Sequence, residues 1–195
     1  MKAYLFFGIF ILLGFSARAQ YRASQLPLSL AYYGNILINP GVKIGTEWEF
    51  RQWEKTPAQN ASPRQHRLSL DPQLAFFQQG GHRSNFQFHL DLAYRIQKLD
   101  RRRYATWALG LGYLQQSQVV NWSFNLSDGS RQDVERTRRH YVLPSLSYEW
   151  GFFSSPRLNW YSKFSFAPWL SAEAANTLSL QVEIGLKWHW STSKN

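Results

Sequence analysis

Two nearby residues, His89 and Asp91, have the side chains and the spacing that acyl transfer or ester hydrolysis would use. An imidazole can take the proton from a serine hydroxyl, and a carboxylate can hold that imidazole in place. Because one residue separates the pair, a strand would turn both side chains to the same face. A serine would have to come from a neighbouring strand. His89 and Asp91 are therefore candidates for catalysis, and a structural place in a polar network is the alternative.

The remaining histidines do not predict a metal or cofactor site. His66, His82 and His140 lack the spacing that zinc ligands share, and His189 alternates with tryptophans near the C-terminus. The chain contains no cysteine, so it has neither a disulfide nor a cysteine for lipid attachment. We expect no metal and no cofactor.

The residues that position these groups belong to stretches in which apolar and polar side chains alternate. This period of two is the signature of a strand with one apolar and one polar face. Turn sequences such as those at 39–41, 80–81 and 128–130 separate the stretches. The predicted strands are residues 28–35, 42–54, 66–78, 85–97, 104–118, 140–153, 158–170 and 178–191.

The strands are too long, and their apolar face is too large, for an ordinary small β-domain. Most exceed the ~5–6 residues of an average strand and reach the ~9–11 that a tilted membrane-spanning strand needs. The interior of an eight-stranded barrel is just filled by its side chains, so the aromatic-rich apolar face has to point outward. We expect an all-β fold: a closed antiparallel up-and-down transmembrane β-barrel of about eight strands with a polar, plugged lumen.

Charged residues occupy the opposite, inward face. An unpaired charge in a narrow interior is costly, so cations and anions should compensate one another. The set contains as many cations as anions, although the whole chain has a net charge of +10. The predicted lumenal charge network comprises Lys43, Glu47, Glu49, Arg51, Arg67, Asp71, Asp91, Arg95, Glu149, Lys163, Glu183 and Lys187.

Aromatic residues gather near both ends of the predicted strands. In such barrels the N-terminus lies on the periplasmic side. The inner-leaflet ends then carry Trp48, Trp53, Tyr94, Tyr104, Trp107, Trp150, Trp160, Trp188 and Trp190, and the outer-leaflet ends carry Tyr32, Tyr33, Phe76, Phe77, Tyr113, Tyr141 and Trp169. Amphipathic rings favour the headgroup level, so we expect two aromatic belts. The alternative is that strands simply favour aromatic residues.

The first residues predict export. Lys2, an apolar stretch at 4–15 and Ala17-Arg18-Ala19 match a signal peptide and its cleavage site. We expect residues 1–19 to be removed and residues 20–195 to form a single barrel domain in the bacterial outer membrane. Nucleic acid is a poor partner for an exported chain despite the positive charge.

The longest outer connection, residues 119–139, is expected to project past the membrane as a hairpin. Its descending arm is rich in arginine, and guanidinium groups pair well with phosphates. Possible contacts to lipopolysaccharide phosphates are Arg131, Arg136, Arg138 and Arg139, with a solvated charged loop as the alternative. A second basic cluster, Lys98 with residues 101–103, falls in a turn on the periplasmic side.

The signal peptide, the amphipathic hairpins and the aromatic final strand at 178–190 resemble those of the small outer-membrane β-barrel proteins of Gram-negative bacteria, of the eight-stranded kind. The resemblance covers nearly all of the mature chain. In that superfamily the last strand usually ends at an aromatic residue that the assembly machinery reads. Here residues 191–195 follow Trp190, which departs from the pattern.

The resemblance implies an architecture and leaves several functions open. The first is a monomeric envelope protein with a structural or surface-interaction role and no open pore, whose partners are outer-membrane lipid, lipopolysaccharide and the assembly machinery. The second is a barrel enzyme acting on envelope lipids, such as a lipid A deacylase. The third is a soluble, secreted, lipocalin-like binding protein, and a narrow porin-like channel is the fourth.

Overall fold

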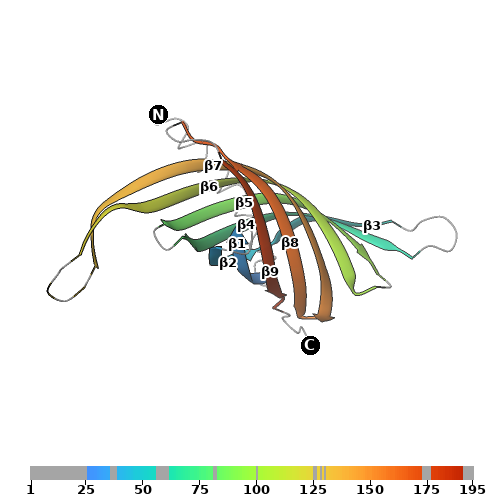
Figure 1. Ribbon diagram of the computed structural model, residues 1–195. Coiled ribbons are helices and arrows are strands. Elements are labelled where there is room, and N and C mark those ends of the chain that lie inside the picture. The colour runs from blue at the N-terminus through green and yellow to red at the C-terminus, as the bar shows by residue number, and fades with distance from the viewer. Residues whose placement is uncertain are drawn as a thin grey trace.

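One antiparallel sheet that closes on itself makes up the computed structural model (Figure 1). The structure describes residues 26–35, 39–55, 62–80, 83–99, 101–124, 127, 129, 131–172 and 177–190, without the side chains of 35, 122, 124 and 131–134. The strands are β1 (Leu28–Asn35), β2 (Asn39–Thr46), β3 (Trp48–Lys55), β4 (Arg64–Gln79), β5 (Arg83–Lys98), β6 (Arg103–Phe124), β7 (Arg131–Ser155), β8 (Leu158–Trp169) and β9 (Thr177–Trp188). The described part of the chain contains no helix long and apolar enough to cross a membrane.

The ring of strands has eight positions, because β2 and β3 are consecutive segments of one wall strand. Both pair with β4, and the strands divide at Glu47. Each other strand pairs with its neighbour in sequence, and β1 joins β9 to close the ring. The predicted fold class, a closed antiparallel barrel of about eight strands, is confirmed. The predicted signal peptide lies outside the described residues.

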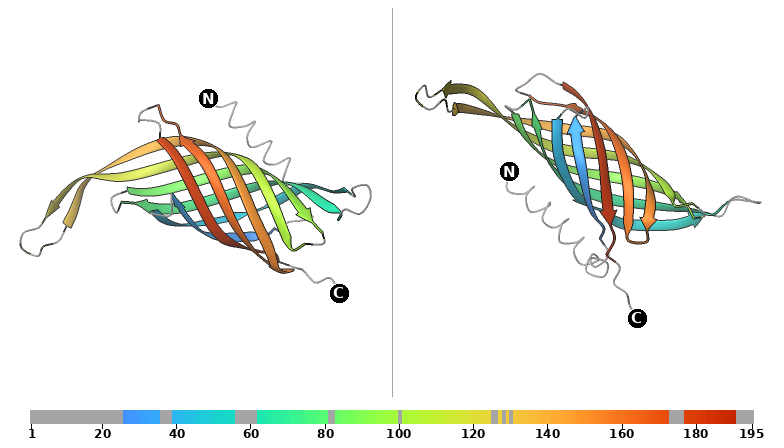
Figure 2. Two further views of the ribbon diagram at one scale, coloured as in Figure 1. Left: turned by 45° about the vertical axis from the view of Figure 1, so that its right-hand side comes forward. Right: turned by 60° about the horizontal axis from the view of Figure 1, so that its bottom comes forward.

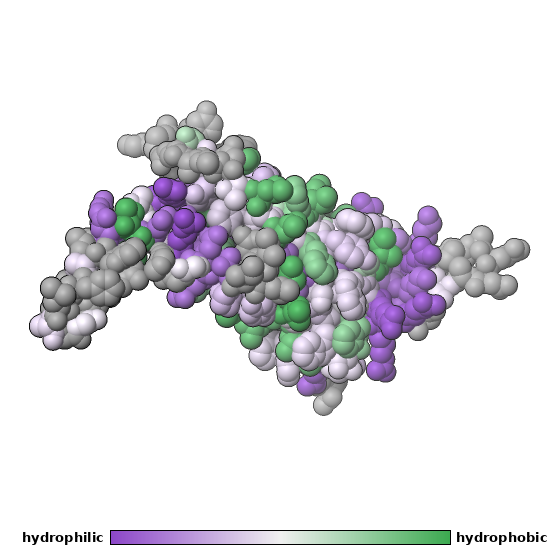
Figure 3. All heavy atoms as spheres, viewed as in Figure 1, coloured by the Kyte–Doolittle hydropathy of each residue, from purple (hydrophilic) through white to green (hydrophobic). Residues whose placement is uncertain are grey.

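The alternation of side chains continues around the wall, with apolar residues outside. Large apolar side chains on every wall strand are between 40% and 65% exposed, from Leu74 and Leu90 to Leu109. Figure 3 shows apolar residues across the middle of one face and hydrophilic residues toward both ends. A monomeric soluble protein rarely exposes an apolar surface of this extent. The prediction that the apolar face points outward is confirmed.

One hairpin extends well beyond the barrel. The β5–β6 ladder stops at Gln118, whereas β6 and β7 stay paired as far as Phe124 and Arg131. The same projection is visible from two other directions (Figure 2). The described residues of 119–139 form the two paired arms of a hairpin that extends beyond the barrel, and its projection past a membrane stays a prediction. The barrel end that carries it is called the loop end here, and the end at which β1 begins and β9 finishes is called the terminal end.

Candidate functional site

Charged residues fill the lumen near the terminal end. Arg95 pairs with Glu47 at 2.8 Å, and Lys187 pairs with Glu149 at 2.6 Å. Lys187 also lies 3.3 Å from Glu47, so these pairs form one cluster. The Arg95 guanidinium stands over the Tyr104 ring, 4.3 Å from its centroid. All of these residues are buried, and the cluster joins charges from β5, β7 and β9 to Glu47, the residue between β2 and β3.

A second cluster in the middle of the lumen contains the candidate catalytic pair. The Nδ1 atom of His89 lies 3.0 Å from Asp91 Oδ1, and the other carboxylate oxygen pairs with Lys163. On the opposite side of the ring, Ser145 Oγ lies 3.1 Å from His89 Nε2. Ser145 comes from β7, two strands away from β5. The structure therefore supplies the serine that the sequence could not identify.

This serine, imidazole and carboxylate have the order of a catalytic triad without a place for a substrate. Ser145, His89 and Asp91 are 8%, 3% and 0% exposed. Between them runs the backbone of β6, where a Cβ on Gly110 would come within 2.0 Å of Asp91 Oδ1 and 2.5 Å of Ser145 Oγ. A nucleophile has to be reached by a carbonyl carbon and by an oxyanion-stabilising donor. The close packing leaves no room for either.

A third pair, Lys43 with Glu183, links β2 to β9 over the inner face of β1, which lies between them. Both side chains are buried, and Lys43 also donates a hydrogen bond to Gln73 Oε1 at 3.1 Å. The Lys43 ammonium lies 4.4 Å from the centroid of the Tyr33 ring, whose hydroxyl donates to Gln87 at 2.7 Å. Polar side chains thus continue without a break toward the loop end.

An apolar cluster, called the cap here, occupies the lumen at the loop end, and sequence reasoning missed it. Tyr33 and Phe77 meet edge to face at 5.3 Å, and Tyr141 and Trp169 lie 5.5 Å apart. The members of the cap are Tyr33, Ala75, Phe77, Leu114, Tyr141, Leu143 and Trp169.

The cap corrects the predicted aromatic belts. Tyr33, Phe77, Tyr141 and Trp169 were expected at the outer headgroup level, and Tyr104 at the inner one, but all five are buried inside. Their neighbours in sequence, such as Tyr32 and Phe76, do face outward. Where two aromatic residues are consecutive, as in Tyr32-Tyr33, a strand puts one ring on each side. This alternation could have indicated that one ring of each such pair faces the lumen.

Not every member of the predicted charge network lies in the lumen. Lys43, Glu47, Asp71, Asp91, Arg95, Glu149, Lys163, Glu183 and Lys187 are buried. Glu49 and Arg67 are half-buried, 3.5 Å apart, and form a pair near the terminal end.

A cavity of about 10 Å³ beside Asp71 has room for roughly one water molecule.

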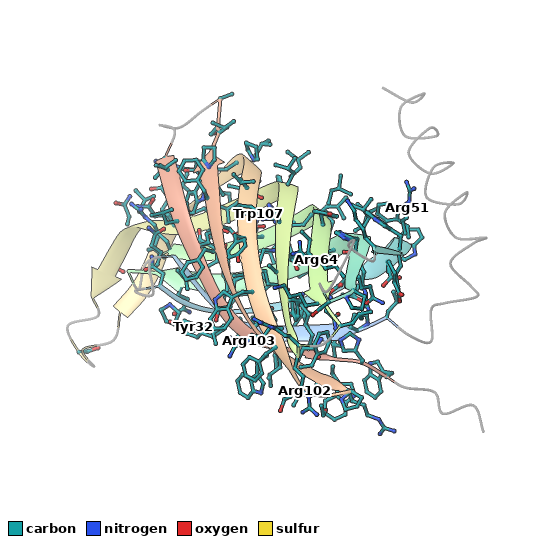
Figure 4. The ribbon with its side chains drawn as sticks, turned by 90° about the vertical axis from the view of Figure 1, so that its right-hand side faces the viewer. Tyr32, Arg51, Arg64, Arg102, Arg103 and Trp107 are labelled. Atoms are coloured by element: carbon teal, nitrogen blue, oxygen red, sulfur yellow. The ribbon has the colours of Figure 1, made fainter. Side chains whose placement is uncertain are left out.

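Arg51 departs from the prediction. A β-bulge shifts the register between Glu49 and Arg51, so Arg51 pairs with the outward-facing Leu68. A bulge adds one residue to one strand and reverses the alternation beyond it. The exposed Arg51 guanidinium instead lies 5.3 Å from the Trp53 ring on the outer surface (Figure 4).

The predicted phosphate-binding arginines divide between the two sides of β7. Arg136 and Arg138 alternate in phase with the exposed Val142, whereas Arg139 is opposite the buried Gln116. His140 shares the outer side and accepts or donates a 2.6 Å hydrogen bond with Tyr113. The side chain of Arg131 lies outside the described residues.

The described residues contain no group of three His, Asp or Glu side chains that could hold a metal ion. The other histidines make pairwise contacts. His66 Nδ1 is 2.7 Å from the Tyr94 hydroxyl, and His189 Nε2 is 2.8 Å from Asn159. His82 lies outside the described residues.

Among solved structures, the chain is similar to small outer-membrane proteins. The outer membrane enzyme PagL is 8% identical, with 86% of this chain and 99% of that chain covered and a TM-score of 0.44. The N-terminal β-barrel domain of OprF from Pseudomonas aeruginosa is 10% identical, with 85% and 97% covered and a TM-score of 0.46. Ail, the attachment invasion locus protein of Yersinia pestis, is 8% identical, with 85% and 95% covered and a TM-score of 0.41. No protein-family model and no curated protein matches the chain.

Proposed function

We propose that the protein is an integral outer-membrane β-barrel that presents the β6–β7 hairpin at the cell surface and does not conduct ions. The observation that carries this proposal is the inverted distribution of side chains, with apolar residues outside and paired charges inside. This arrangement suits a barrel surrounded by lipid. A lipocalin-like carrier would need the opposite, an apolar cup inside and a polar exterior.

The terminal end faces the periplasm in this proposal, so the loop end faces outward. From Gln118 to Phe124 the hairpin extends roughly 20 Å along its own length beyond the end of the β5–β6 ladder, at about 3.3 Å per residue. That length clears the headgroup region and gives a partner two exposed strand edges. The hairpin is therefore the part of the molecule best placed for surface interaction.

Two measurements on one strain test the proposal. An epitope inserted next to Gly129, where a Cβ would meet nothing within 4 Å, should be labelled by antibody on intact cells. The same protein in the outer-membrane fraction should change gel mobility when it is boiled, as folded barrels do. An epitope inserted in the β7–β8 turn, beside Arg157, is the control and should be labelled only after permeabilisation. Recovery as a soluble monomer without detergent would contradict the proposal.

Contact with lipopolysaccharide phosphates is the partner that we propose for the outer side of the hairpin. Arg138 supports it, because this exposed guanidinium shares a side of β7 with the apolar wall. Arg138→Gln should lower the amount of lipopolysaccharide that copurifies with the barrel. Arg139→Gln removes the same charge from the other side of the strand and should leave that amount unchanged. If both variants lost the same amount of copurified lipopolysaccharide, the net charge of the hairpin, and not a specific contact of Arg138, would explain the loss.

An enzyme acting on envelope lipids is the second candidate, favoured by the hydrogen bond between Ser145 and His89 and by the 3.0 Å contact between His89 and Asp91. We propose that this group is structural, because no substrate reaches it. A fluorophosphonate probe, which reacts with nucleophilic serines, should fail to label the folded barrel. Labelling that disappears in Ser145→Ala would establish the enzyme and overturn the structural assignment.

A further inference from the structure

A row of cations crosses the outer wall at the terminal end. Lys55 is the direct cross-strand partner of Arg64, and Arg64 is the direct partner of Lys98. Directly opposed side chains in an antiparallel pair lie about 5 Å apart, and like charges there repel. No ion pair joins any of the three to a carboxylate in the part of the chain that the structure describes. Within the described residues, the row therefore lacks the paired carboxylates that the lumenal cations have.

Two more cations follow Lys98: Arg101 in the β5–β6 turn and Arg103 at the start of β6. Backbone hydrogen bonds hold the turn in place. Arg101 donates its N–H to the Lys98 carbonyl at 3.2 Å, and Leu99 donates to Pro63 at 3.1 Å. On the other side Phe153 donates to the carbonyl of Arg102 at 2.8 Å. The turn is thus tied to the chain before β4 and to the end of β7, which fixes where Arg101 and the following Arg103 leave the backbone.

These cations border an open groove of about 390 Å³ on the outer surface. Its rim consists of Arg64, Lys98, Arg101 and Arg103, and its floor includes Ile96 and Trp150. Arg64 and Arg103 are exposed (Figure 4). Among the residues that the structure describes, no acidic side chain lines the groove. One end of the groove is therefore strongly basic, and the floor that leads toward the apolar wall is aromatic and aliphatic.

We propose that this groove binds one anionic phospholipid of the inner leaflet, with its phosphodiester at the basic rim and an acyl chain along the floor. The inference rests on the proposed function, which puts the terminal end at the periplasmic face. Guanidinium groups match the geometry of phosphate oxygens and bind them with two parallel hydrogen bonds. The apolar floor distinguishes a lipid from free phosphate, which would use only the rim.

Trp150 provides the reporter, because it forms part of the floor and is 46% exposed. The full barrel is purified from membranes and inserted in phosphatidylcholine vesicles. Phosphatidylglycerol with brominated chains, which quench tryptophan on contact, is then compared with brominated phosphatidylcholine. The signal of Trp150 is the difference between the native protein and Trp150→Phe. We expect phosphatidylglycerol to quench Trp150 in preference to phosphatidylcholine, and inorganic phosphate to leave the quenching unchanged.

A matched pair of variants tests the role of the rim. Arg64→Gln/Arg103→Gln removes two rim charges and should lower the preference for phosphatidylglycerol by about fivefold for each cation. Arg102→Gln/Arg157→Gln removes the same charge at the same end but outside the groove, and should keep the preference. Equal loss in both doubles, no loss in either, or relief of quenching by inorganic phosphate would overturn the proposal.

The two proposals fail in different ways. A protein that neither enters vesicles nor changes gel mobility on boiling contradicts membrane insertion itself. A protein that inserts normally and shows no preference for the anionic lipid contradicts only the phospholipid site. Asp100, which precedes Arg101 in the sequence and is outside the described residues, stays unchanged in every variant.

Discussion

At the scale of single residues, the lumen shows how a barrel keeps charges out of water. Lys43 and Glu183 are 3% and 1% exposed, and each has the other as its counter-ion. Such a pair is weak evidence for stability, because desolvation offsets much of the attraction. Removing one member is a different matter, since the remaining charge stays buried without its partner.

The first prediction concerns this pair. Lys43→Met should lower the free energy of unfolding by about 3–5 kcal/mol, because it leaves Glu183 buried and unpaired. The double variant Lys43→Met/Glu183→Gln should recover most of that loss. Urea unfolding of the barrel in lipid vesicles, followed by tryptophan fluorescence, measures both values. Arg157→Met, at an exposed turn, is the control and should change the free energy by no more than about 0.5 kcal/mol. A double variant as unstable as Lys43→Met would show that burial of charge is not the cause.

At the scale of strands, β6 makes the middle of the lumen possible through small residues. Gly110 and Gly112 face inward on β6, between the strands that carry His89 and Ser145. The imidazole lies directly against the backbone of β6 at this point. Large residues at these positions would push the ring away from its carboxylate, so the two glycines set the space for the polar cluster.

The second prediction follows from the contact at Gly112. A Cβ there would come within 2.2 Å of His89 Cδ2, closer than real Cβ atoms approach another heavy atom. Gly112→Ala should therefore destabilise the barrel by about 1–3 kcal/mol through overpacking. Equilibrium unfolding in urea measures the loss.

The control is the same substitution in a His89→Ala background. There the cost of Gly112→Ala should be smaller, because the ring that it meets is gone. An undiminished cost would place the strain elsewhere in β6.

At the scale of the whole molecule, two kinds of side-chain cluster occupy the barrel interior, one of ion pairs and one of aromatic and aliphatic residues. Ion pairs fill the terminal and middle parts of the lumen, and the cap that includes Tyr33, Phe77 and Trp169 seals the loop end. Either barrier alone opposes the passage of a hydrated ion. The ion pairs would have to break for an ion to pass, and the aromatic rings pack against one another over the lumen.

The third prediction is that the barrel does not conduct. Planar-bilayer recordings of the purified protein should show no steady current. The variant Tyr33→Ala/Phe77→Ala/Trp169→Ala should also stay closed, because the charged clusters below the cap remain intact. A stable channel in the native protein would contradict the plugged lumen, and a channel in the variant alone would assign the seal to the cap.

Much of this architecture was available from the sequence, because the alternation of side chains along a strand is a local property. The run at 42–54 was predicted as one strand, and β2 and β3 together occupy it as one wall strand. The outward direction of the apolar face followed from the limited volume of a small barrel. The grouping of charges on the inner face followed from the same period.

Only the tertiary structure decided which side chains meet, because register and bulges depend on pairing between strands. The bulge beside Glu49 put Arg51 outside. Pairing across two strands brought Ser145 to His89, and the cross-strand row of Arg64 and Lys98 put like charges together on the outer wall. The pair with which the sequence began, His89 and Asp91, does face inward as its spacing required. Closure of the barrel surrounded the pair with packed strands, and this enclosure is the reason for which we propose a structural role for it.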